Sequence, residues 1–483
     1  MTTVPRLPRR LGALVGAALL LLSALTLVAL PAAARPASTA GTSAPSVLRA
    51  GEKVPNPTLT SPPATGVLFD PQSIVDGLGP ANYLQEEYFL SGTARAYQQV
   101  GTWGSDGAWT AALSGATAPY TTRMIVRRPA GRAAFNGTVV VEWLNVSAGL
   151  DTAPDWGFAR EELLRKGYAW VGVSAQLNGL TTLKNLQPAR YGALSHPGDS
   201  FSYDIYSQAA QAVASPVGVK PLGDLKAKRL IADGESQSAS RMTTYVNAIQ
   251  PLTQRFDGFM IHSRSAGSAP ISQAPQPFVP GVSPARIRTD QKVPVLVFLS
   301  ETDVLGHLAA RQPDSRHYRL WEVPGTAHVD KYMLGPVGLI GLGCVLPVND
   351  GPQHYVFNAA LRSLTKWIRN DSYVPPKAPR IWTDANGAIM RDRHGNALGG
   401  IRTPQLDVPV KLLLGSGNSP AFCGLAGTST PFDAATLAAL YPTRATYLDA
   451  YVYATLDALN RKFMLGDDFA AIIREALEAP VVG

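Results

Sequence analysis

Short apolar runs recur along the middle of the chain, separated by turn-forming residues and by longer amphipathic stretches. Several of them, such as "GTVVVEWLN" and "VPVLVFLSE", are continuously apolar and β-branched, which is typical of strands covered on both faces. The runs lie at residues 86–94, 121–129, 137–145, 167–175, 228–234, 256–263, 293–301 and 317–325. This pattern predicts an eight-stranded sheet.

Helical patterns lie between these runs at residues 156–166, 202–215 and 238–251. Strand, helix and strand in alternation indicate an α/β fold, in which a mostly parallel sheet carries helices on both faces. The first two runs have no helix between them, so we expect the sheet to start with an antiparallel pair.

The pattern changes after about residue 330 and predicts a C-terminal extension of helices and hairpin turns. The stretch 355–370 is an amphipathic helix with Phe357, Leu361, Leu364 and Ile368 on one stripe. The stretch 381–400 alternates around "ANG" and "HGN", which favours hairpin turns. Its aspartates resemble a calcium loop only superficially, because the full set of acidic ligands and the closing Glu are missing. Two or three more helices are expected in the last 50 residues.

The N-terminus has the pattern of an export signal. Arg6, Arg9 and Arg10 precede an apolar stretch from Leu11 to Leu30, and residues 32–34 offer a small-residue cleavage site. The same stretch is long enough to act as an uncleaved membrane anchor, and no second stretch of that length follows. We therefore expect a signal peptide at 1–34, a flexible linker at 35–65, a catalytic core at 66–330 and a C-terminal extension at 331–483. The protein would be secreted, or held on the outer face of the membrane if the signal is uncleaved.

Composition narrows the class of protein further. The chain has 483 residues, of which 46% are hydrophobic and 16% charged, so it can bury a sizeable core. Its formal net charge is +8, but the basic residues do not gather into long runs, which argues against a nucleic-acid partner. In an exported chain the two cysteines, Cys344 and Cys423, favour a disulfide, although two buried free thiols are the alternative. Two cysteines alone cannot form a structural zinc site.

Candidate chemistry centres on "RLIADGESQSASRM", in which Ser236 follows an apolar run and precedes a helical pattern. Glu301 ends the run at 293–301, Asp303 follows it closely, and His328 follows the run at 317–325. Functional residues gather at the carboxyl ends of parallel strands, so these side chains are expected at one edge of the sheet. A serine nucleophile needs a base and a group that orients the base, and this set offers both.

The three residues occur along the chain in the order Ser, Asp, His, which is the order found in α/β-hydrolases. The region from about 85 to 330 resembles the α/β-hydrolase fold. "GESQS" resembles the nucleophile elbow, "LSETDVL" the acid loop and "VPGTAH" the histidine loop. The segments "VVVEWLNVSAGLDTAPDW", "HPGDSFSYDIYSQ" and "GNALGGIRTP" extend the likeness to exported bacterial α/β-hydrolase-domain proteins of undefined substrate. The resemblance implies that Ser236 is the nucleophile, His328 the general base and Asp303 its partner, with Glu301 as the rival acid.

The resemblance also implies an oxyanion hole and a pocket. The backbone N–H of Gln237 is expected to be one oxyanion donor, and that of Val146 the second. Candidate substrate-binding residues are Asn145, Trp143, Trp156 and Glu235.

Two further residues, Ser238 and His262, bear on this interpretation of Ser236. Ser238 stands where the usual motif has glycine; we expect any small residue to fit there, with the strained backbone at Ser236 itself. His262 ends its own strand and is a competing base, or a buried polar residue beside the pocket.

These patterns predict a secreted serine hydrolase that acts on a small-molecule or polymeric carboxylic ester. A peptidase or amidase would use the same three residues, and a non-enzymatic binding protein on a hydrolase scaffold is a further alternative. No metal or organic cofactor, no nucleic acid and, after signal cleavage, no membrane is implied.

Overall fold

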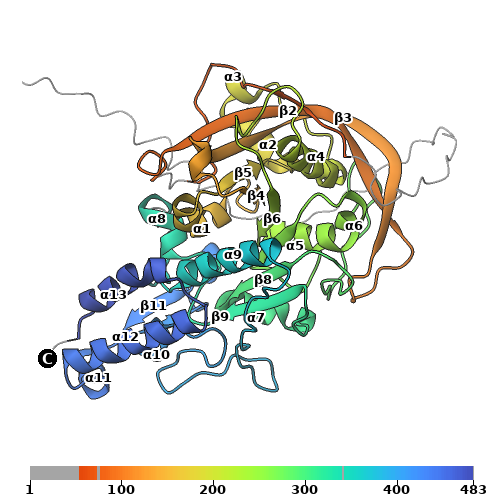
Figure 1. Cartoon of the computed structure of the whole chain (residues 1–483). Coiled ribbons are helices and arrows are strands. Elements are labelled where there is room, and N and C mark those ends of the chain that lie inside the picture. The colour runs from red at the N-terminus through yellow and green to blue at the C-terminus, as the bar shows by residue number, and fades with distance from the viewer. Residues whose placement is uncertain (1–53, 73–76, 340–341, 482–483) are drawn as a thin grey trace, which may run out of the picture.

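The computed structural model describes residues 54–72, 77–339 and 342–481 (Figure 1). The predicted signal peptide and most of the predicted linker lie outside these residues. The described chain contains a nine-stranded sheet in the order β1-β2-β3-β5-β4-β6-β7-β8-β9. The strands are β1 (Thr58–Thr60), β2 (Tyr83–Val100), β3 (Thr110–Pro129), β4 (Thr138–Trp143), β5 (Ala169–Val173), β6 (Arg229–Glu235), β7 (Gly258–His262), β8 (Val295–Ser300) and β9 (Tyr318–Val323).

All eight predicted runs form strands of this sheet, and the mostly parallel architecture is confirmed. Strands β5, β4, β6, β7, β8 and β9 pair in parallel, whereas β1, β2 and β3 pair antiparallel with their neighbours. The additional strand, β1, lies within the stretch expected to be a linker, where Leu59 pairs with Leu90 and is buried. Three residues are too few to show a period-2 pattern, so the sequence gives no signal for this strand.

Helices cover both faces of the sheet. They are α1 (Pro154–Arg165), α2 (Leu177–Leu186), α3 (Pro188–Tyr191), α4 (Ser202–Ala214), α5 (Gln237–Thr244), α6 (Gln250–Thr253), α7 (Glu301–His307), α8 (Lys331–Leu339) and α9 (Gln353–Arg369). Strand β4 shows the two layers: Val139 and Val141 pack in the core with α4 and α5, and Val140 packs in the core with α1 and α9. Every residue of β4 is buried, as its apolar run predicts.

The predicted C-terminal extension includes α8 and α9 and continues beyond α9. It contains α10 (Pro404–Asp407), β10 (Lys411–Leu414), β11 (Thr428–Pro431), α11 (Ala434–Leu440), α12 (Arg444–Asn460) and α13 (Phe469–Glu478). Helices α11–α13 pack around a small separate core, to which Tyr355 of α9 contributes, and Figure 1 shows them in blue beside the main body. The stretch 381–400 forms tight turns with isolated bridges, such as Thr383 to Ile389 and Arg391 to Ala397. No helix of the described residues is long and apolar enough to cross a membrane.

The predicted disulfide is present and joins Cys344 to Cys423, whose Cα atoms are 5.5 Å apart. It closes a loop of 79 residues within the extension. Replacing both cysteines with serine should lower the free energy of unfolding by roughly 2–4 kcal/mol, because the unfolded chain regains loop entropy. Urea unfolding of the double variant and of reduced and oxidised wild type measures this change. Equal midpoints for all three samples would contradict it.

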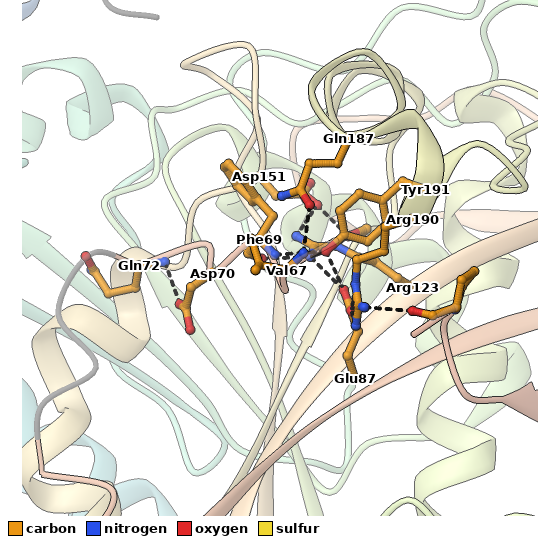
Figure 2. A network of polar contacts seen from close by, with 12 residues as sticks. Val67, Phe69, Asp70, Gln72, Glu87, Arg123, Asp151, Gln187, Arg190 and Tyr191 are labelled. Atoms are coloured by element: carbon orange, nitrogen blue, oxygen red, sulfur yellow. Dashed lines mark hydrogen bonds and ion pairs between the residues drawn. The ribbon is translucent and has the colours of Figure 1, made fainter. Parts of the chain in front are cut away.

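A buried polar network anchors the loop that follows β4 (Figure 2). The guanidinium of Arg123 on β3 donates to Glu87 on β2 at 3.0 Å and to Asp151 in the loop at 3.2 Å. The hydroxyl of Tyr191 donates to Glu87 at 2.9 Å, and Arg190 pairs with the same carboxylate. Moving the loop away would separate Asp151 from Arg123 and leave a buried charge without a partner. The network therefore holds this loop against the sheet.

Candidate active site

Ser236 occupies the sharp turn between β6 and α5. Strand β6 ends at Glu235 and helix α5 begins at Gln237, leaving Ser236 between them with φ 59° and ψ −114°. Residues other than glycine rarely adopt a positive φ, and such a backbone conformation costs of order 1–3 kcal/mol. The backbone N–H of Ser236 donates to the His262 carbonyl at 3.0 Å, which ties the turn to β7. The turn therefore lifts the serine side chain above the carboxyl end of the strand.

Close packing explains the small residues on either side of Ser236. A Cβ atom added to Gly234 would lie 3.1 Å from Cβ of Ser238 and 3.1 Å from Cγ of Met242. Ser238 is itself fully buried, and the positive φ falls on Ser236 rather than on Ser238. The expectation that a small residue other than glycine fits this position is thus confirmed.

Two further loops bring an imidazole and a carboxylate to Ser236. His328, in the loop after β9, has Nε2 2.8 Å from Oγ of Ser236. Its Nδ1 is 2.6 Å from Oδ1 of Asp303, which lies in the first turn of α7 just after β8. The other Asp303 oxygen accepts from the backbone N–H of Ser300 at 3.1 Å and from its hydroxyl at 2.6 Å. The three predicted side chains therefore form one continuous hydrogen-bonded chain at the predicted edge of the sheet.

Burial and neighbouring charges have opposite effects on the pKa values of Asp303 and His328. Burial alone would raise the pKa of Asp303, but the positive charge of His328 and hydrogen bonds from His328, Ser300 and Ser263 lower it to about 2. Burial would lower the pKa of His328, but Glu235 and Asp303 outweigh it and raise that pKa well above its ordinary value. The acid is thus held ionised, and the imidazole is strongly basic.

Glu301, the rival acid, faces away from His328. Its carboxylate accepts from the backbone N–H of Gly325 at 2.7 Å and pairs with Arg391 of the extension at 2.8 Å. Helix α7 begins at Glu301, so residues 301 and 303 point in nearly opposite directions around the helix axis. The geometry favours Asp303 as the partner of His328 and gives Glu301 a structural position.

A cavity of about 370 Å³ opens at Ser236. It is lined by Ser236, Gln237, Ser240, Ser263, Arg264, Ser265, Thr302, Asp303, Gly306, His328 and Leu425. Most of the lining residues have polar side chains, although apolar atoms make up the larger part of the lining surface, and Leu425 is contributed by the C-terminal extension. Its carbonyl accepts from the N–H of Val329, next to His328, so the extension forms one wall of the site.

The structure places the two predicted oxyanion donors differently. Gln237 is the first residue of α5 and lines the cavity, and N–H groups at a helix start have no acceptor within the helix. Val146 is buried and is not part of the cavity lining; its carbonyl accepts from the N–H of Gly149 at 3.0 Å. Gln237 is therefore the better placed of the two donors.

The tryptophans expected in the pocket lie in the core instead. Trp143 packs against Tyr203 and Tyr206 on one face of the sheet, and Trp156 packs against Trp170 on the other. Both indoles are fully buried, and neither lines the cavity. Both aromatic side chains fill the core between the sheet and its helices, so the prediction that they bind substrate is corrected here.

Asn145 and Glu235 are engaged with each other rather than with the cavity. The Asn145 amide donates to the carbonyl and to Oε2 of Glu235, both at 3.0 Å. Oε1 of Glu235 lies 2.8 Å from Nε2 of His328. Neither side chain belongs to the cavity lining, so the expected substrate contacts are replaced by contacts within the site.

His262, the competing base, is buried under the site. Its Nδ1 lies 2.5 Å from Asp155 on α1, and its Nε2 faces Gln353 on α9 at 3.4 Å. Burial lowers the pKa of His262 to about 4, so this imidazole is neutral near pH 7. It acts as a buried polar residue and not as a partner of Ser236.

The loop after β7 is a part of the site that the sequence pattern did not indicate. Ser263, Arg264 and Ser265 all line the cavity, and Ser263 has a positive φ of 54°. In sequence, "SRSAGSA" at residues 263–269 indicates only a loop of small residues. Its position at the carboxyl end of a parallel strand was the signal that could have identified it. Among the described residues, no group of three or more His, Cys, Asp or Glu side chains could hold a metal ion.

A serine on a strand–turn–helix elbow, followed by acid and histidine loops on later strands of a mostly parallel sheet, defines the α/β-hydrolase class. The chain belongs to the alpha/beta hydrolase domain family, whose model matches residues 48–474. A search of curated protein sequences found no match.

Similar solved structures include several hydrolases. An α/β serine hydrolase without a lid from Xanthomonas campestris is 15% identical, with 43% of this chain and 80% of that chain covered and a TM-score of 0.27. One of two fungal esterases from Rhizomucor miehei is 12% identical over 59% of this chain and 84% of that chain, with a TM-score of 0.31. A rice cell wall degrading esterase from Xanthomonas oryzae is 11% identical over 44% of this chain and 50% of that chain, with a TM-score of 0.23.

Proposed function

We propose that this chain is a secreted serine hydrolase that cleaves carboxylic esters through an acyl-enzyme on Ser236. The observation that carries the proposal is the continuous chain from Ser236 Oγ to His328 Nε2 at 2.8 Å and from Nδ1 to Asp303 at 2.6 Å. A serine hydroxyl is a weak nucleophile unless a base stands within hydrogen-bond reach and is itself oriented. His328 and Asp303 are placed to meet these two requirements.

In acylation, Oγ of Ser236 attacks the ester carbonyl carbon while its proton moves to Nε2 of His328. The imidazolium then gives that proton to the departing alkoxide, and the alcohol leaves. In deacylation a water molecule takes the place of the alcohol: it loses a proton to Nε2 and attacks the acyl carbon. The carboxylic acid leaves, and the proton returns to Ser236. Asp303 holds Nδ1–H throughout and offsets the positive charge on the ring.

The negative oxygen of each tetrahedral intermediate needs hydrogen-bond donors. The N–H of Gln237 is the first donor in this proposal, because it opens helix α5 at the cavity wall. We retain the N–H of Val146 as the proposed second donor, on the anchored loop after β4. The cavity of about 370 Å³ is within the usual size of ligand pockets and supports a small-molecule ester as substrate.

The disulfide supports export from the cytosol, since such bonds persist in oxidising compartments. Export itself rests on the proposed signal peptide at residues 1–34. Expression of the full chain in a bacterial host, followed by N-terminal sequencing of the exported protein, tests both parts. Cleavage near residue 34 is the expected result, and retention of the intact chain in the cytosol would contradict it.

Hydrolysis assays with matched esters and amides test the reaction class. p-Nitrophenyl acetate and butyrate should be hydrolysed, whereas peptide p-nitroanilides should be hydrolysed far more slowly or not at all. Faster cleavage of the anilides would indicate the amidase or peptidase alternative. If neither the esters nor the anilides are hydrolysed over a prolonged incubation, a non-enzymatic role would be favoured.

A further inference from the structure

The catalytic imidazole is approached by a carboxylate on each of its two ring nitrogens. Nδ1 of His328 faces Asp303 at 2.6 Å, and Nε2 faces Oε1 of Glu235 at 2.8 Å. The same Nε2 is 2.8 Å from Oγ of Ser236, the atom whose proton it is proposed to take. Glu235 is the residue just before Ser236, and it is only 3% exposed.

The position of the Glu235 carboxylate is fixed by its surroundings. Asn145 holds Oε2 and the backbone carbonyl of Glu235 with one amide group. Oε1 has no aligned hydrogen-bond donor among the described residues, so its close partner is the edge of the imidazole. A buried carboxylate oxygen with no donor of its own is costly unless a positive charge faces it.

The other titratable groups near His328 do not supply this charge balance. His262 at the end of β7 is neutral near pH 7, because burial lowers its pKa to about 4. Burial also raises the pKa values of Asp155 on α1 and Asp233 on β6 well above the ordinary value. The negative charge of Glu142 adds to this effect for Asp155, and that of Asp155 adds to it for Asp233, which favours the neutral form of both carboxyls. Glu235 and Asp303 are therefore the two negative charges that bear on the imidazole.

We propose that Glu235 is a second carboxylate partner of His328, which stabilises the positive charge that the ring acquires when Nε2 takes the Ser236 proton. This inference rests on the proposed serine-hydrolase function. A negative oxygen 2.8 Å from Nε2 repels the lone pair of the neutral ring and attracts the N–H of the imidazolium. The free enzyme consequently holds the imidazolium to higher pH than a triad with one carboxylate does, and the neutral base that remains is stronger.

The sign of the pH effect follows from this charge arrangement. Protonated His328 cannot act as a base, and its raised pKa means that protonation persists above pH 6.5. The acid limb of kcat/KM should therefore lie above pH 6.5 in the wild type. Removing the Glu235 charge should shift this limb to lower pH and weaken the base at the same time.

The test compares Glu235→Gln with Glu301→Gln across a range of pH. Glutamine keeps the shape of Glu235, and its side-chain oxygen can still accept from Asn145. Glu301→Gln removes a charge from the same edge of the sheet without touching His328, because Glu301 faces Gly325 and Arg391. Two rates are measured for each protein: kcat/KM with a p-nitrophenyl ester, and the rate at which a fluorophosphonate labels Ser236. Thermal melts confirm that each variant is folded.

For Glu235→Gln we expect the acid limb to move down by about one pH unit or more in both rates, and the plateau above the limb to fall about 10-fold. For Glu301→Gln the limb should stay in place. A lower plateau without a shift would assign Glu235 a merely structural role and overturn the inference, as would an unchanged profile. A wild-type limb at or below pH 6.5 would also overturn it without any variant. A wild type that neither hydrolyses esters nor reacts with the probe would instead refute the proposed function, and this inference with it.

Discussion

Ser236→Ala is expected to lower kcat for ester hydrolysis by about 10⁴-fold or more, to the rate that binding and oxyanion donors alone supply. The Ser236 hydroxyl is placed to attack a carbonyl while giving its proton to His328 Nε2, 2.8 Å away. Alanine cannot form the acyl-enzyme, yet it removes only one oxygen from the cavity wall. Steady-state kinetics with p-nitrophenyl butyrate measure the effect, with KM expected to change little.

Ser238→Ala is the matched control for this substitution. It removes a hydroxyl from the same turn, but Ser238 is fully buried beneath the elbow and does not line the cavity. Its activity should remain within a few-fold of wild type. If Ser236→Ala kept activity comparable to that of Ser238→Ala, the acyl-enzyme mechanism would be wrong.

Asp303→Asn should have the second largest effect, a fall in kcat of about 10³- to 10⁴-fold. The Asp303 carboxylate accepts a hydrogen bond from the Nδ1–H of His328 at 2.6 Å and balances the charge of the imidazolium. An asparagine amide would present a donor or an uncharged oxygen there, so the ring would lose the tautomer that leaves Nε2 free to accept a proton. The pH profile of kcat and the thermal stability of the variant are measured together.

Glu301→Gln decides between the two candidate acids. Glu301 bonds to Gly325 and Arg391, so its neutralisation should lower stability rather than the rate of the folded enzyme. We expect kcat to stay within a few-fold of wild type in the fraction that is folded. The opposite ranking, in which Glu301→Gln loses more kcat than Asp303→Asn, would exchange the roles of the two residues.

The periodicity of the chain was enough to predict the main sheet, because buried parallel strands are nearly continuous apolar runs. It could not predict β1, since three residues such as Thr58–Thr60 show no period. Functional residues gather at the carboxyl ends of parallel strands, and Ser236, Asp303 and His328 each follow a recognisable strand. They were therefore expected at one edge of the sheet. Chain order and strand ends therefore carry most of the information about the hydrogen-bonded chain.

The surroundings of Ser236, His328 and Asp303 depend on the directions in which neighbouring side chains point, and the sequence does not state these directions. Trp143 and Trp156 stand on either side of the loop after β4 in sequence but point into the two cores. Glu235 was expected to meet substrate, yet its carboxylate turns to His328 Nε2. Leu425 reaches the cavity from nearly 100 residues beyond His328, through an extension whose packing has no local sequence signal.

The most direct test of the central claim is covalent labelling of the folded protein with a fluorophosphonate, followed by peptide mass spectrometry. Such a probe phosphonylates a serine that a neighbouring base has activated. The account predicts a single adduct on Ser236 in the wild type, no adduct in Ser236→Ala, and strongly slowed labelling in Asp303→Asn. Absence of labelling in the folded wild type, or an adduct on another serine that persists in Ser236→Ala, would contradict it.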